Sequence, residues 1–175
     1  MTVFVALLRA VNVGGTGMLP MKDLQALAVG LGLLHVRTYI QSGNLLFESS
    51  RPEQEIASDL QRALARKTGR PVRVLIRTAS ALRAILDSNP FRDAKPSQVA
   101  VVFLSEPAPK DLMVGLVTPG REQVRLADRE IFIHYPDGMG RSKLKLPSLA
   151  AEGTARNLNT LVKLVAMTSD QALGG

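Results

Sequence analysis

The chain has 175 residues, of which 46% are hydrophobic and 21% charged, a composition typical of a folded protein and not of a disordered chain. It contains no cysteine, which excludes disulfides, thiolate zinc sites and thiol nucleophiles. The formal net charge of +7 favours anionic partners such as nucleic acid, phosphorylated metabolites or an acidic membrane, unless the basic residues form a solvated face with no partner.

The basic residues gather in two segments. Residues 62–83 contain arginine and lysine but no acidic residue, and a second group comprises Arg141, Lys143, Lys145 and Arg156. The apolar start, TVFVALLRAVNV, lacks a basic leader and a cleavage site and is interrupted by Arg9, so we do not expect a signal peptide. No stretch approaches the ~18 apolar residues of a membrane helix. We therefore expect a soluble cytoplasmic protein without membrane association.

The first half of the chain alternates between strand and helix patterns. Residues 3–11 are apolar on both faces, which is typical of a central, covered strand. The following patterns predict, in order, a glycine-rich loop, a helix from Pro20 to Gly32, hairpin strands at 36–41 and 45–48, a helix from Pro52 to Gly69, and a strand at 71–78.

The second half gives a similar series. The patterns predict a short helix capped by Ser80, a connection at 94–98, a strand at 99–104, a helix near 109–116, strands at 123–128 and 130–135, a helix opening at GRSK with Ser142 as its N-cap, and a closing helix from about Thr154.

These elements predict an α+β protein with two ferredoxin-like subdomains. Residues 1–90 form the first, in the order β-α-β-β-α-β, and residues 91–175 form a related β-α-β-β-α-α unit with the C-terminal helix. The similarity of the two units rests on element order alone, because no repeat is visible residue by residue.

Four segments carry a resemblance to a known family: ALLRAVNVGG, VRTYIQSGNLLF, GRSKL and GTARNLNTLVKL. Together they resemble an uncharacterised, mostly bacterial family, domain of unknown function sixteen-ninety-seven. The resemblance implies an α+β fold with ferredoxin-like subdomains, but no established activity, substrate or catalytic residue. Ala10 stands where the family usually has glycine, and Leu158 stands where it usually has tryptophan.

The glycine loop and the QSGN turn are the first candidate binding segments. The loop matches neither the P-loop nor the dinucleotide fingerprint, because Leu19 and Pro20 stand where those motifs need glycine. It is either a flexible turn or a set of backbone N–H groups that bind an anion. The turn is explained by hairpin geometry or by presentation of amides to a ligand.

GRSK and ARN are the other two candidates. Arg141 and Lys143 would lie beside a helix start, where cations oppose the helix dipole unless an anion binds there as well. Arg156 would lie in a first helical turn, either as a salt-bridge partner or as a ligand contact.

Other chemistries find little support. The two histidines are far apart, which makes a metal site improbable, and no nucleophile elbow or acid–base pair stands out, so we expect no cofactor. RNA recognition through Phe4 and Phe47 is possible but not favoured, because the first strand is apolar on both faces and these rings fit a core. Oligomeric state is left open.

The leading hypothesis is a module that binds a phosphorylated small molecule or another anion in a cleft between the two subdomains. The alternatives are an enzyme acting on a phosphorylated substrate, a nucleic-acid-binding module or a protein-interaction module. The residues predicted to line the cleft come from all four segments: Arg9, Asn12, Gly14, Gly15, Gln41, Ser42, Asn44, Arg141, Ser142, Lys143, Arg156 and Asn157.

Overall fold

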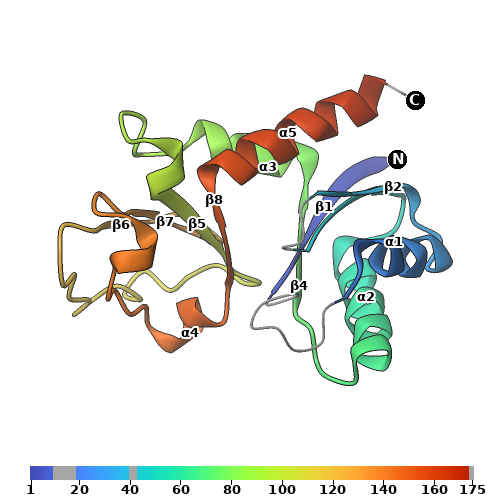
Figure 1. Ribbon diagram of the computed structural model, residues 1–175, viewed down its shortest axis with the longest axis horizontal. Helices are drawn as coiled ribbons and strands as arrows, with labels where there is room; N and C mark the ends of the chain where they lie inside the picture. The colour runs from blue at the N-terminus through green and yellow to red at the C-terminus, as the bar shows by residue number, and fades with distance from the viewer. Residues whose placement is uncertain (10–18, 40–42, 174–175) are drawn as a thin grey trace. The chain divides into compact units, whose positions relative to one another are not determined.

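The computed structural model describes residues 1–9, 19–39 and 43–173 and has the α+β architecture that the sequence predicts (Figure 1). The chain divides into two compact units, which we call unit 1 (Met1–Arg83 with Leu164–Gly175) and unit 2 (Ala84–Lys163). Each contains one four-stranded antiparallel sheet. The last residues of the chain are thus grouped with unit 1, whereas the sequence grouping had placed them with the second half.

Unit 1 follows the predicted element order. Its elements are β1 (Thr2–Leu8), α1 (Met21–Gly30), β2 (Leu34–Tyr39), β3 (Asn44–Ser49), α2 (Glu53–Thr68) and β4 (Val74–Thr78). The strands lie in the order β2-β3-β1-β4, so β1 is central.

Proline and glycine set the limits of these elements as predicted. Pro20 and Pro52 stand immediately before α1 and α2, where the missing N–H has no helical partner to lose. Gly69 ends α2 in the left-handed conformation, with φ 76°. Gly43 has φ 81° in the turn between β2 and β3, a conformation that other residues rarely adopt.

The core of unit 1 explains the apolar first strand. Residues on both faces of β1 are buried, as expected for a central, covered strand. Phe4 and Phe47 stack with ring centroids 5.6 Å apart, and both belong to the cluster that α1 and α2 cover. They are core residues, so these two rings are not available to stack on RNA bases.

Unit 2 is built on a sheet with the same relative strand order. Its strands are β5 (Val99–Phe103), β6 (Gln123–Leu126), β7 (Glu130–His134) and β8 (Thr154–Asn157), arranged β6-β7-β5-β8. The short helix α4 (Ser148–Ala151) precedes β8. Two helices belong to both units along the chain: α3 (Ala79–Asp87) and α5 (Leu158–Leu173).

The helix predicted near 109–116 is wrong. The segment instead forms successive turns, in which the amides of Leu112 and Leu116 donate to carbonyls three residues earlier. Prolines flank the segment, and Gly115 has φ 80°, which a right-handed helix does not allow. Leu112 and Met113 still pack against the apolar face of the sheet.

The helix predicted to open at GRSK is also wrong. A single 3-10 turn covers Met139–Arg141, and no helix begins until Ser148, after Pro147. In the intervening segment, Leu144 and Leu146 pack against the core of unit 2, while Lys143 and Lys145 are exposed. This period-two pattern indicates an extended chain, so Ser142 is not a helix N-cap.

The start predicted for the closing helix is wrong by four residues. Residues 154–157 form β8 and pair with β5, with Arg156 opposite Val101. Helix α5 begins at Leu158, and the Asn157 side chain caps it by accepting a hydrogen bond from the amide of Thr160, 2.9 Å away. The segment was mistaken for helix because TARN shows no apolar alternation.

A local repeat connects the two units. In unit 1, β4 ends in Arg77 and Thr78, and the Thr78 hydroxyl caps α3 by accepting from the amide of Ala81. In unit 2, β8 ends in Arg156 and Asn157, and Asn157 caps α5 in the same position. Both arginines are buried. The cap of α3 is therefore Thr78 and not Ser80, which the sequence had suggested.

Candidate functional site

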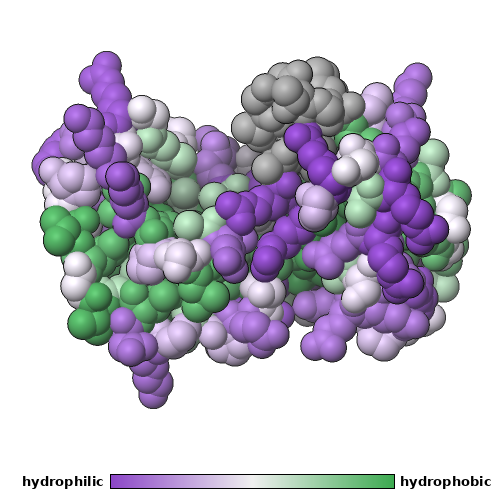
Figure 2. Space-filling model, turned by 90° about the horizontal axis from the view of Figure 1, so that it is seen from below, coloured by the Kyte–Doolittle hydropathy of each residue, from purple (hydrophilic) through white to green (hydrophobic). Residues whose placement is uncertain are grey.

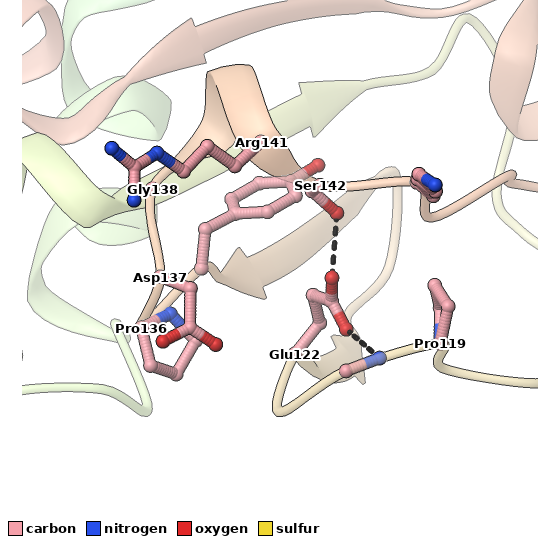
Figure 3. A pocket seen from close by; sticks show the side chains of 10 residues that line it. Pro119, Glu122, Pro136, Asp137, Gly138, Arg141 and Ser142 are labelled. Atoms are coloured by element: carbon pink, nitrogen blue, oxygen red, sulfur yellow. Dashed lines mark hydrogen bonds between the residues drawn. The ribbon is translucent and has the colours of Figure 1, made fainter.

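A small polar pocket lies within unit 2, and its lining comes from three segments: 119–122 before β6, 135–138 after β7, and 141–143 after the 3-10 turn (Figure 3). We call it the polar pocket. Its volume is about 160 Å³. The extended segment after Arg141 holds the third wall, because Leu144 and Leu146 anchor that segment in the core.

Glu122 is fixed by two hydrogen bonds at one side of the pocket. The Ser142 hydroxyl donates to Oε1 at 2.7 Å, and the amide of Gly120 donates to Oε2 at 2.8 Å (Figure 3). The Ser142 oxygen in turn accepts from the amide of Leu144 at 3.1 Å. The hydrogen bond from Ser142 is the main cause that lowers the pKa of Glu122, so this residue is a carboxylate at neutral pH.

Asp137 is held by an ion pair. Both carboxylate oxygens accept hydrogen bonds from the Arg121 guanidinium, with a distance of 3.2 Å from Nε to Oδ2. This contact is the main cause that lowers the pKa of Asp137, and the charge of Arg141 lowers it further. Figure 3 shows Arg141 on the same side of the pocket as Asp137.

Two cations of the pocket differ from its carboxylates. Arg141 and Lys143 are exposed, and within the described ranges no side-chain hydrogen bond or ion pair involves either. The phenol of Tyr135 also lines the pocket, and its partial burial raises its pKa, with a smaller contribution from the charge of Glu122. The pocket thus offers two cations and several fixed polar groups.

The GRSK prediction identified three residues of this pocket, namely Arg141, Ser142 and Lys143, although for the wrong structural reason. Sequence reasoning missed Glu122, Tyr135 and Asp137. The strand ending at His134 and the PDG turn after it were visible, but their meeting with residues 119–122 depends on the β6–β7 pairing. The alternation of Lys143 to Leu146 was the signal that could have excluded a helix.

The ARN residues have structural roles in the described part of the chain. Arg156 is 8% exposed, and its guanidinium donates to the Thr154 hydroxyl and to the carbonyl of Ala155. Burial lowers its pKa to about 10. Asn157 caps α5, and neither residue lines the polar pocket.

The remaining predicted residues belong to unit 1. Asn44 is fully buried in β3 and donates to the carbonyl of Tyr39, which closes the hairpin. The amide of Arg9 donates to the carbonyl of Arg73 beside the sheet. The other predicted residues lie outside the described residues: Asn12, Gly14, Gly15, Gln41 and Ser42. A cleft that joins all four segments therefore stays a prediction.

The histidines have ordinary contacts. His134 is half-buried in β7 with its ring 5.5 Å from that of Phe91, and His35 lies 3.2 Å from Glu48. Among the described residues, no three or more His, Asp or Glu side chains are grouped in a way that could hold a metal ion. None of the helices in the described part of the chain is long and apolar enough to cross a membrane.

The two sheets and the pocket define an α+β protein of two units. The chain belongs to the family of proteins of unknown function DUF1697, whose model matches residues 1–132. It is similar in fold to the solved structure of the conserved bacterial protein SP0830 from Streptococcus pneumoniae, with a TM-score of 0.78 at 24% sequence identity over 95% of this chain and 98% of that one. A comparison with curated proteins gave no match.

Proposed function

We propose that the protein is a binding module for a small anion-bearing molecule, such as a phosphorylated metabolite, and that the polar pocket of unit 2 is its site. One observation carries the proposal: the pocket carboxylates have protein partners, whereas its cations do not. Glu122 accepts from Ser142 and Gly120, and Asp137 is paired with Arg121. Arg141 and Lys143 line the same pocket with no counter-ion among the described residues.

The pocket suits a compact group. A volume of about 160 Å³ equals the liquid volume of roughly five water molecules and lies below the range of drug-sized sites. A phosphate or carboxylate would accept from Arg141 and Lys143 in charge-assisted hydrogen bonds. Glu122 and the Tyr135 phenol would then contact hydroxyl groups of the same ligand, which gives preference to a hydroxylated molecule over a bare anion.

We also infer that both units are variants of the ferredoxin-like arrangement. In unit 1, the element order β-α-β-β-α-β and the strand order β2-β3-β1-β4 support this inference. In unit 2, the same relative strand order supports it, with turns in place of the first helix and α4 as the second. The basis of the functional proposal remains the pocket, because this fold hosts many unrelated functions.

The test is titration calorimetry of the full chain with inorganic phosphate and glycerol 3-phosphate. We expect binding of both, and a loss of about tenfold in affinity for Arg141→Ala and for Lys143→Ala, the low end expected for an exposed charge-assisted contact. Both side chains are exposed, so the melting temperatures should stay close to that of the wild type.

Lys110→Ala is the matched control. Lys110 is an exposed cation of unit 2 that does not line the polar pocket, so its removal changes the net charge equally. If Lys110→Ala weakens phosphate binding as much as Lys143→Ala, the attraction is a property of the overall basic charge and the pocket is not the site. Absence of binding by the wild type at millimolar phosphate would also reject the proposal.

A further inference from the structure

A second hollow adjoins the polar pocket and differs from it in chemistry. We call it the apolar groove. Val114, Leu116 and Val117 of the turn segment form one wall, and Leu146 and Pro147 of the segment before α4 form the other. Its volume is about 470 Å³. Pro119 and Lys143 line both hollows, so the two are continuous at these residues.

The groove presents more apolar surface than solitary exposed residues would. Val114 is 81% exposed and Val117 is 77% exposed, and Leu149 of the neighbouring α4 is 43% exposed. Figure 2 shows hydrophobic side chains gathered over unit 2 on this face, with hydrophilic side chains projecting from their margin. Contiguous apolar surface with a polar margin is typical of a binding site.

The charge around the groove has one sign. Lys143 and Lys145 line it, and no carboxylate does so among the described residues. The positions of both lysines follow from the alternation in the extended segment, in which Leu144 and Leu146 are anchored in the core. A ligand that fits both features is apolar along its length and anionic at the end near Lys143.

We propose that the natural ligand is a free, single-chain amphiphile, whose anionic headgroup binds in the polar pocket while its aliphatic chain lies in the apolar groove. This inference rests on the proposed function and narrows its ligand class. A free chain is favoured over a bilayer because the groove has two walls, which bury a chain from both sides. A membrane surface would need protruding side chains but no second wall.

The probes are inorganic phosphate, octyl phosphate below its critical micelle concentration, and octanol, each titrated into the full chain. Octyl phosphate should bind at least about tenfold more tightly than inorganic phosphate, roughly the effect of withdrawing two methylene groups from water. The double variant Val114→Ser/Val117→Ser should lose about tenfold in affinity for octyl phosphate and keep its affinity for inorganic phosphate within about twofold. Arg141→Ala should weaken both anions.

Val29→Ser is the control, because Val29 is 58% exposed on α1 of unit 1, away from the groove residues in the fold unit that carries them. Equal binding of octyl phosphate and inorganic phosphate would overturn the amphiphile inference and leave the proposed function standing. Failure of both anions to bind would reject the proposed function itself. Binding of octanol as tight as that of octyl phosphate would overturn the role of the headgroup. Binding to phosphatidylglycerol vesicles without binding of monomeric octyl phosphate would assign the groove to a membrane and overturn the inference.

Discussion

Replacement of Gly153 by alanine tests the most constrained backbone position in unit 2. Gly153 precedes β8, and an added Cβ would lie 2.5 Å from the carbonyl oxygen of Phe103 and 2.8 Å from Cγ1 of Val102. Phe103 belongs to the central strand β5 and pairs with Thr154. The nearest atom is thus backbone inside a sheet, which cannot rotate away as the end of a flexible side chain could.

The magnitude follows from two opposing effects. Relieving the contact requires β8 to shift by about half an ångström or more, and overpacking of this kind costs about 1–3 kcal/mol. Alanine also restricts the unfolded chain, which returns about 0.4–1 kcal/mol to the free energy of unfolding. We therefore expect Gly153→Ala to lower the free energy of unfolding by about 1–2 kcal/mol.

Urea denaturation at 25 °C measures this change. Gly30→Ala is the matched control, because nothing lies within 4 Å of the position that its Cβ would occupy, at the last residue of α1. The control should be neutral or more stable by up to about 1 kcal/mol. If Gly153→Ala is as stable as Gly30→Ala, then β8 does not pack this closely on β5, and the strand assignment of residues 154–157 loses its main support.

Two further predictions concern the caps and an ion pair. Thr78→Ala and Asn157→Ala should each lower the free energy of unfolding by about 1 kcal/mol in urea titrations, since each removes an N-cap, and a loss for one residue alone would contradict the equivalence of the two positions. Asp59→Asn should lower the melting temperature at pH 7, because a hydrogen bond from Arg51 lowers the pKa of Asp59 below 3.8 in the folded state. A carboxylate with a lowered pKa stabilises the fold above 3.8 and loses this effect as the pH falls, so the difference between wild type and variant should shrink below pH 3.8 in thermal scans; a difference that persists there would exclude the ion pair as its cause.

The local repeat shows a limit of sequence reading. Residues 76–79 and 155–158 share only their arginine, yet each places a buried arginine and a capping residue between a strand and a helix. Threonine and asparagine differ in sequence but both present an oxygen to the third helical amide. The equivalence is one of hydrogen-bond geometry, and letters alone do not reveal it.

Arg77 illustrates a different limit. The strand pattern placed Arg73, Leu75 and Arg77 on one face, which suggests an exposed face with two cations. Leu75 and Arg77 are instead buried, at 4% and 1% exposed, because both faces of the sheet of unit 1 are covered at this strand. Alternation gives the two faces of a strand, but whether a second layer covers the polar one depends on the rest of the chain.

The sequence by itself determined unit 1, where local signals agree with one another. Pro52 and Gly69 limit α2, and Gly43 turns the hairpin, because these residues act through their own backbone torsions. It also singled out Arg141, Ser142 and Lys143 through their charge. Only the tertiary structure decided the rest of the polar pocket and the strand identity of residues 154–157. The reason is physical: Glu122 meets Ser142, and β8 meets β5, through hydrogen bonds between residues far apart in the chain, and no local propensity encodes those contacts.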